Sequence, residues 1–141
     1  MEEGMIRQAL KLRKVDAGSY SPLVLAYIGD AVYEVLIRTK VVNQGSMQVN
    51  KMHKRSAALV KAQAQANMVK LLMEDFSEEE TAVYKRGRNA KSATMAKHAT
   101  MTDYRMATGL EALVGYLYLT GRYERLLELI RKGLEKMGEM S

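Results

Sequence analysis

The chain has 141 residues, 48% of them hydrophobic, and a formal net charge of +6. This length and composition predict one domain with its own core and exclude an intrinsically disordered chain. Cysteine is absent, which excludes disulfides and thiolate chemistry. The acidic start and the lack of a long apolar run argue against a signal peptide and a membrane span. We therefore expect a cytoplasmic protein with no membrane partner.

The first strong helix signal is Ser21 followed by Pro22, the only proline in the chain. Serine at the N-cap accepts a hydrogen bond from a free backbone N–H, and proline suits the first helical position. We expect this helix to run to about Lys40. An alanine-rich segment from about Met47 to Met73 predicts further helix, with a break near Asn50.

The segment Ser77-Glu-Glu-Glu80 matches a capping box, in which serine and glutamate satisfy each other's backbone N–H groups. It predicts a helix that ends near Arg86-Gly87. Residues 87–101 are rich in Gly, Asn, Ser, Thr and Lys, which predicts a loop.

A threonine, Thr100 or Thr102, is expected to cap the next helix, which runs to about Thr120. An amphipathic helix is predicted for about residues 123–137. Strand-like alternation is absent from the sequence, so we predict an all-α fold in which residues 1–141 form a single domain.

The basic residues are concentrated in two stretches. Residues 35–73 contain seven Lys or Arg and no acid, and residues 85–102 contain five and no acid. Such stretches are typical of a surface that binds a polyanion, most simply a nucleic acid. They are also compatible with a solvated basic face, and charge alone leaves both interpretations open.

Two acids interrupt segments that are otherwise apolar on nearly every face. Asp30 lies within residues 23–37, and Glu111 lies within residues 107–119. This pattern predicts buried helices, and a buried carboxylate needs a partner charge, hydrogen bonds or a metal. Each acid alone is compatible with a structural ion pair. If the two meet across a pair of helices, they form a site suited to Mg²⁺, which prefers carboxylate oxygens and water.

Glu34 lies one turn after Asp30, but it stands four residues before Arg38. This is the favourable order for an ion pair along a helix, so we expect Glu34 to pair with Arg38.

The segment Leu25-Ala-Tyr-Ile-Gly-Asp-Ala-Val-Tyr33 resembles the signature helix of the ribonuclease III family, and Leu110-Glu-Ala-Leu-Val-Gly-Tyr-Leu117 resembles its second motif. The two occur in the family's order, about 80 residues apart. Lys85-Arg-Gly-Arg-Asn-Ala-Lys-Ser92 and Asp103-Tyr-Arg105 are similar to Mini-ribonuclease III, the stand-alone bacterial form without a double-stranded-RNA-binding domain.

This resemblance implies a helical catalytic domain that forms a homodimer largely through the signature helix. It implies cleavage of double-stranded RNA with Mg²⁺, for which Mn²⁺ is a substitute, leaving 5′-phosphates and 3′-hydroxyls. Asp30 and Glu111 would be the catalytic metal ligands. The implied substrate is the precursor of large-subunit (23S) ribosomal RNA, and the resemblance leaves room for a ribosomal protein that presents it.

A catalytic domain without an accessory domain must contact A-form RNA itself, through the RNA backbone and minor-groove hydroxyls. The candidate contacts are the cations of the two basic stretches: Lys51, Lys54, Arg55, Lys85, Arg86, Arg88 and Lys91.

The chain departs from the larger family enzymes at three positions. They carry further carboxylates where this chain has Leu23, Ala26 and Thr108. These departures motivate a second hypothesis, a catalytically inert RNA-binding relative that acts in ribosome assembly. A third hypothesis, a helical protein-interaction module, also stays open.

Overall fold

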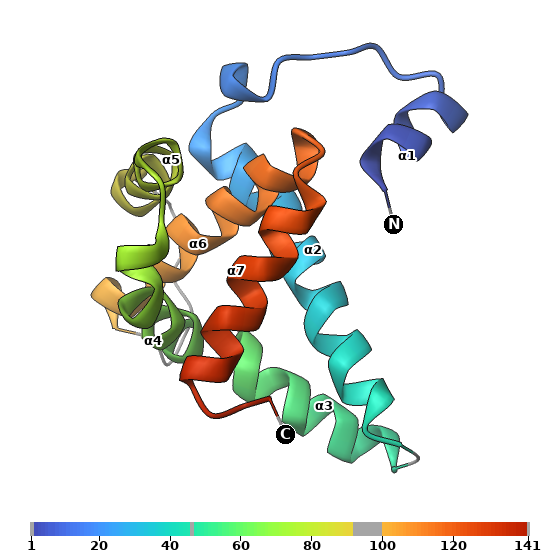
Figure 1. The fold of residues 1–141 in the computed structure, drawn as a ribbon, viewed down its shortest axis with the longest axis vertical. Helices are drawn as coiled ribbons and strands as arrows, with labels where there is room; N and C mark the ends of the chain where they lie inside the picture. The colour runs from blue at the N-terminus through green and yellow to red at the C-terminus, as the bar shows by residue number, and fades with distance from the viewer. Residues whose placement is uncertain (1, 46, 92–99, 141) are drawn as a thin grey trace.

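Helices form almost the whole of the computed structural model, which describes residues 2–45, 47–91 and 100–140. This part of the chain contains no strand, and the predicted all-α fold is confirmed (Figure 1). In chain order the elements are α1 (Glu3–Ala9), η1 (Ala17–Ser19), α2 (Pro22–Asn43), α3 (Val49–Val60), α4 (Ala62–Leu72), η2 (Met73–Asp75), α5 (Glu78–Asn89), α6 (Met101–Leu119) and α7 (Tyr123–Lys136).

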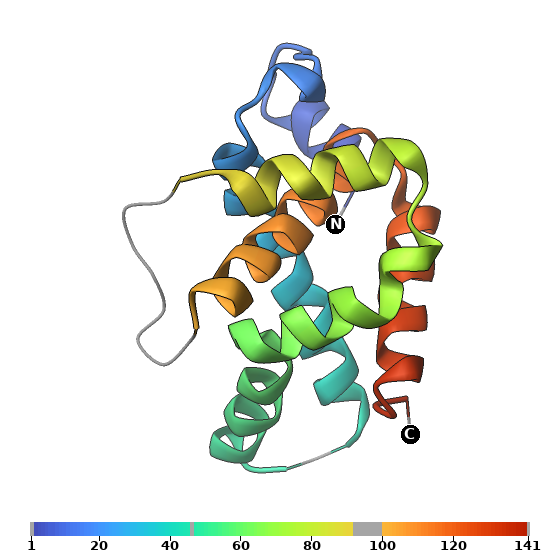
Figure 2. The ribbon, with the colours of Figure 1, turned by 90° about the vertical axis from the view of Figure 1, so that its left-hand side faces the viewer.

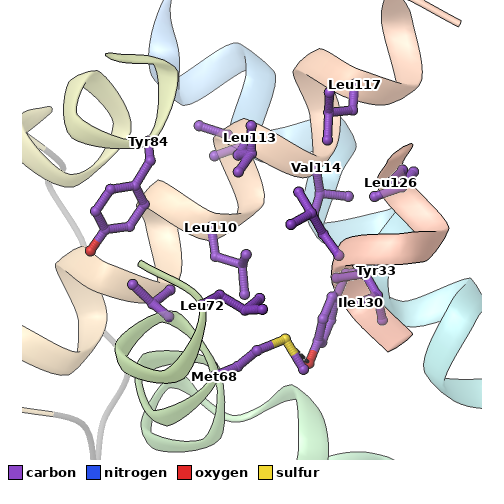
Figure 3. Close-up of a cluster of buried hydrophobic side chains, with 14 of the residues drawn as sticks. Tyr33, Met68, Leu72, Tyr84, Leu110, Leu113, Val114, Leu117, Leu126 and Ile130 are labelled. Atoms are coloured by element: carbon purple, nitrogen blue, oxygen red, sulfur yellow. Dashed lines mark hydrogen bonds between the residues drawn. The ribbon is translucent and has the colours of Figure 1, made fainter. Parts of the chain in front are cut away.

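Helix α6 is the central element of the fold. It packs against α2, α4, α5 and α7, and the two ribbon views show it enclosed between them (Figures 1 and 2). The core forms where these helices meet, from side chains that include Tyr33, Met68, Leu110, Leu113 and Val114 (Figure 3). Burial of these apolar side chains is the main stabilising contribution.

Three helix starts follow the predicted capping chemistry. The Ser21 hydroxyl accepts a hydrogen bond from the backbone N–H of Val24, with Pro22 at the first helical position. The capping box of Ser77 and Glu80 is formed in both directions. Thr100 caps α6, so the first of the two predicted threonines is the cap.

Three features differ from the sequence-based expectations. The helical break falls at Lys61, which has an extended backbone (φ −64°, ψ 154°), and not near Asn50. Helix α5 continues to Asn89, so the predicted loop does not begin at residue 87; its residues 92–99 lie outside the described part. Helix α1 was not predicted, and its Glu3 N–H donates to the Tyr123 hydroxyl at 2.9 Å.

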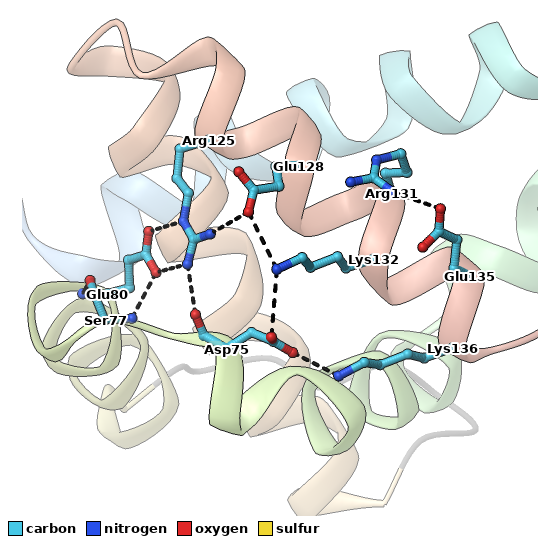
Figure 4. Close-up of polar contacts among 9 residues, drawn as sticks. All are labelled: Asp75, Ser77, Glu80, Arg125, Glu128, Arg131, Lys132, Glu135 and Lys136. Atoms are coloured by element: carbon cyan, nitrogen blue, oxygen red, sulfur yellow. Dashed lines mark hydrogen bonds and ion pairs between the residues drawn. The ribbon is translucent and has the colours of Figure 1, made fainter.

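An ion-pair network joins the start of α5 to α7. Glu80 is 4% exposed, and the Arg125 guanidinium donates to both of its carboxylate oxygens at 2.8 Å (Figure 4). Lys132 and Lys136 reach Asp75 from the same helix (Figure 4). The network fixes α7 against the α4–α5 connection, since a buried carboxylate is strongly favoured to keep its partner.

None of the helices in the described ranges is long and apolar enough to cross a membrane.

Candidate metal centre and basic surface

Helices α2 and α6 touch through their backbones at two glycines. A Cβ atom on Gly29 would lie 1.7 Å from the carbonyl oxygen of Glu111, and one on Gly115 would lie 2.0 Å from the carbonyl oxygen of Leu25. Any side chain at either position would force the helices apart. The glycine beside Asp30 therefore brings α2 against the turn of α6 that carries Glu111.

Asp30 and Glu111 are brought together by this contact. Their carboxyl groups lie within hydrogen-bonding reach of each other. Glu111 is partly buried, but Asp30 is exposed, so the expectation of two buried acids is wrong for Asp30. Asp30 lies on the outer side of α2, where Tyr27 and Ala31 are also exposed. The pair thus forms a site that is open to solvent on one side.

The proximity of Asp30 strongly affects the ionisation of Glu111. Burial and, next, the negative charge of Asp30 raise the pKa of Glu111 to about 8, whereas a hydrogen bond from Gln65 lowers it. Two carboxyl groups at this spacing favour holding one proton between them near neutral pH. A divalent cation that replaces this proton would remove the repulsion, so the arrangement suits a cation.

The apolar neighbour of the site is Tyr33, one turn after Gly29. Its buried hydroxyl donates to the carbonyl oxygen of Leu59 at 3.1 Å. Burial and the charge of Glu111 raise the pKa of Tyr33. The hydroxyl therefore stays protonated, and its hydrogen bond goes to the main chain of α3 and not to Glu111.

Gln65 is a contact of Glu111 that the sequence analysis did not identify. Its Nε2 donates to Glu111 Oε2 at 3.4 Å and to the carbonyl oxygen of Val60 at 2.9 Å. Within its alanine-rich segment, Gln65 has no motif around it that would mark it as a site residue.

The three positions at which the resemblance leads us to expect carboxylates contribute no ligand here. Leu23 is exposed and Ala26 is buried. The Thr108 hydroxyl donates to the carbonyl oxygen of Tyr104 at 3.0 Å, within its own helix. No group of three or more His, Cys, Asp or Glu that could hold a metal occurs among the described residues. A cation at this site would therefore have two carboxylates from this chain and take its other ligands from water or substrate.

Glu34 does not join the pair. The Arg38 guanidinium binds its carboxylate, with Nη2 at 2.8 Å from Oε1, and the predicted ion pair along the helix is confirmed.

The candidate RNA contacts lie on two elements. Helix α3 exposes the first group, and the end of α5 and the following residues carry the second; together they are Lys51, Lys54, Arg55, Lys85, Arg86, Arg88 and Lys91. All are exposed except Arg88, which is partly buried with its guanidinium 5.7 Å from the centre of the Tyr84 ring. Such a contact holds an arginine in place without neutralising its charge.

The end of α5 is tied to the helix that carries Glu111. A Cβ atom on Gly87 would lie 2.7 Å from the Cβ of Ala112 and 2.9 Å from the Cα of Gly109. Gly87 stands between the cations of Arg86 and Arg88. This basic segment and the acid pair are therefore both fixed to α6.

Comparisons with known proteins agree with this arrangement. The sequence matches the family described as Ribonuclease III domain over residues 23–122. A protein from Thermoanaerobacter named Mini-ribonuclease 3 is 47% identical over 136 residues, which cover 96% of each chain. A protein of the same name from Clostridium tetani is 50% identical over 119 residues, covering 84% of this chain and 79% of that one. The crystal structure of a Fusobacterium nucleatum protein superposes with a TM-score of 0.77 at 32% identity, covering 83% of this chain and 95% of that chain.

Proposed function

Because the chain belongs to the ribonuclease III family, we propose that it cleaves double-stranded RNA with Mg²⁺ at Asp30 and Glu111. The expectation of an endoribonuclease, a hydrolase, is confirmed by this membership. We further propose that the substrate is the 23S ribosomal RNA precursor, that the products carry 5′-phosphates, and that the protein is cytoplasmic. The whole chain, residues 1–141, acts as one catalytic domain.

The observation that carries the proposal is the convergence of the two carboxylates. Asp30 and Glu111 come from different helices and face one another although their charges repel. Such a pair is costly to a fold unless a cation offsets it. Carboxylate oxygens with several waters are the ligand set that Mg²⁺ prefers, and Mn²⁺ accepts the same set.

The residues of the chain divide the task between them. Asp30 and Glu111 hold the divalent ion, which when bound activates water and offsets charge on a phosphodiester. The exposure of Asp30 leaves one side of the site open to a phosphate group. The cations of α3 and of the end of α5 bind the phosphates of the duplex.

The homodimer is supported by an apolar stripe on the outer face of α2. Leu23, Val24, Tyr27, Ala31 and Val35 are all exposed on this helix. Residues four apart lie on one side of a helix, so these side chains form a continuous apolar surface next to Asp30. A second copy that covers the stripe would bring two acid pairs into one particle, one for each strand of the RNA.

A second candidate function is an inert relative that binds RNA without cutting it. It is favoured by the Thr108 hydroxyl, which is engaged with the backbone of its own helix and leaves the site with two acids. The close pairing of Asp30 and Glu111 argues against it, since a protein that only binds RNA gains nothing from two acids in repulsion. A helical protein-interaction module accounts for neither the acid pair nor the cations.

The decisive experiment compares the wild-type protein with Glu111→Gln and the matched control Glu34→Gln. Each is incubated with long double-stranded RNA, with Mg²⁺ or with a chelator. We expect metal-dependent cleavage in the wild type and in Glu34→Gln, and none in Glu111→Gln. Binding without cleavage in all three would instead establish the inert relative. The absence of both binding and cleavage would support the protein-interaction module.

A further inference from the structure

Gln65 is a buried polar side chain beside the acid pair. It is 2% exposed, lies on α4 and reaches both the end of α3 and Glu111 on α6. Two other buried polar side chains have hydrogen-bond partners: the Glu80 carboxylate accepts from Arg125, and the Thr108 hydroxyl donates to a carbonyl of its own helix. Gln65 Oε1, in contrast, is buried with no hydrogen-bond partner among the described residues.

The orientation of the Gln65 carboxamide is set by its two acceptors. The break at Lys61 ends α3, so the carbonyl of Val60 takes its hydrogen bond from the Gln65 side chain at 2.9 Å. The same Nε2 faces the carboxylate of Glu111. If the amide nitrogen and oxygen were exchanged, the amide oxygen would face the oxygens of Val60 and Glu111. The hydrogen-bond network therefore assigns Nε2 to the side that faces these two acceptors.

This orientation places an acceptor next to the candidate metal centre. Gln65 Oε1 belongs to the same carboxamide group whose Nε2 contacts Glu111, so the unpaired acceptor is one bond angle away from that contact. A buried amide oxygen without a donor is unfavourable, and buried polar atoms normally find one. Once a cation has replaced the proton of the pair, Asp30 and Glu111 are both ionised, accept hydrogen bonds only and supply no proton to Gln65 Oε1. A hydrated divalent cation supplies such donors, because each of its waters carries two hydrogens.

We propose that Gln65 is the positioning residue of the Asp30–Glu111 site: its Nε2 holds one oxygen of Glu111, and its Oε1 accepts a hydrogen bond from the hydrated cation. This inference rests on the proposed function, since it needs a divalent ion at the acid pair. Outer contacts of this kind fix the orientation of a metal ligand and restrict it to productive geometries. In a site with two carboxylates most ligands of the ion are waters, so a residue that holds one of those waters fixes part of the coordination shell.

A purely structural role for Gln65 makes a different prediction. If it only satisfied the carbonyl of Val60 at the α3–α4 break, its loss would lower stability and leave metal affinity unchanged. The two roles are separated by measuring Mn²⁺ binding directly, from the electron paramagnetic resonance signal of the free ion. This readout does not depend on RNA cleavage.

The variant is Gln65→Met, which keeps the unbranched shape and removes both hydrogen-bonding atoms. Its control is Val69→Ala, which removes methyl groups from the buried face of the same helix and no polar atom. We expect Gln65→Met to bind Mn²⁺ about 10- to 100-fold more weakly than the wild type. Val69→Ala should keep the wild-type affinity even where it is less stable. Equal Mn²⁺ affinity in Gln65→Met and wild type would overturn the proposal.

A second measurement uses the wild-type protein and does not require that the variant folds. The side-chain NH₂ signals of Gln65 are followed by NMR during a Mg²⁺ titration, together with the backbone amides of Asp30 and Glu111. We expect all three sets of signals to shift with one midpoint. A shift at Asp30 and Glu111 without one at Gln65 would overturn the positioning role and leave the proposed function intact. No saturable shift at any of them would overturn the metal site itself.

Discussion

The backbone of Glu111 lies directly against Gly29. There is no room for a side chain at Gly29, because a Cβ there would lie 1.7 Å from the Glu111 carbonyl oxygen. The two acids are therefore neighbours because their helices touch, and not because their side chains attract each other. Gly115 makes the reciprocal contact with α2, one turn further along α6. The site is built into the packing of the core, which holds the two carboxyl groups together in the absence of a cation.

Gly29→Ala tests this origin of the site. The new methyl group meets backbone atoms that cannot rotate away, so we expect a loss of unfolding free energy of about 3 kcal/mol or more, with loss of cleavage. Urea unfolding followed by circular dichroism measures the change. The control is Gly18→Ala, because the atoms nearest to a Cβ there are those of the Asp16 carboxylate, at 3.5 Å or more. A Gly29→Ala protein as stable as Gly18→Ala would contradict the contact.

The helices that begin with a local signal were predicted from the sequence. Ser21, Ser77 and Thr100 cap their helices through hydrogen bonds to residues three positions later, so a short segment contains the whole cause. The break at Lys61 has no such signal, since alanine-rich sequence on both sides favours helix. Gly87 was interpreted as a helix end, but α6 uses its missing side chain for close packing. At Gly87 a tertiary contact therefore overrode the local signal.

The acid pair was predicted, but its surroundings were not. The apolar residues around Asp30 suggested a buried helix, whereas Tyr27, Ala31 and Val35 are exposed in this chain. The sequence pattern of an apolar helix face is the same whether the face is covered by the core of its own chain or by a second molecule, so the pattern alone does not distinguish the two. Gln65 was missed because it contacts Glu111 from 46 residues away, through the fold alone.

The stability of the metal-free protein should depend on Glu111. Its pKa rises from the ordinary 4.5 to about 8 in the folded state, so the folded chain holds a proton that the unfolded chain releases. Unfolding free energy should therefore fall as pH rises from about 5 to about 8, by roughly 1–3 kcal/mol after allowance for solvent screening. Glu111→Gln should lack this fall. Thermal unfolding in a chelator at several pH values measures it, and parallel curves for the two proteins would refute the assignment.

Arg88 is expected to contact a phosphate of the RNA. Its guanidinium is placed over Tyr84, and its Nε donates to the neutral side chain of Asn89 rather than to a carboxylate. Arg88→Ala should weaken binding of double-stranded RNA and reduce the slope of log affinity against log salt by about 1. Arg131→Ala, whose arginine pairs with Glu135 on α7, should leave the slope unchanged. An unchanged slope in Arg88→Ala would remove this residue from the RNA surface.

Arg125 should contribute to stability more than any exposed ion pair. Arg125→Met leaves Glu80 buried and without its main partner, so we expect a loss of about 2–4 kcal/mol near pH 7. The hydrogen bond from Arg125 lowers the pKa of Glu80, so this contribution is present at neutral pH and is lost as pH falls and Glu80 takes up a proton. Arg131→Met, which breaks an exposed pair, should cost less than about 1 kcal/mol. Urea unfolding at several pH values compares them.

The apolar stripe on α2 should be the surface that joins two copies of the chain. Tyr27 lies at the centre of the stripe and is 82% exposed. In a single copy of the chain this large side chain stays in contact with water. Tyr27→Asp places a charge where the second copy would have to desolvate it, so we expect the mass in solution to fall from two chains to one. Val49→Asp adds the same charge to an exposed valine at the start of α3 and should leave the mass unchanged. Light scattering during size-exclusion chromatography measures both. A wild-type mass of one chain would exclude the stripe as a dimer surface. A single chain would then have to cut the two strands of duplex RNA one after the other at the same acid pair.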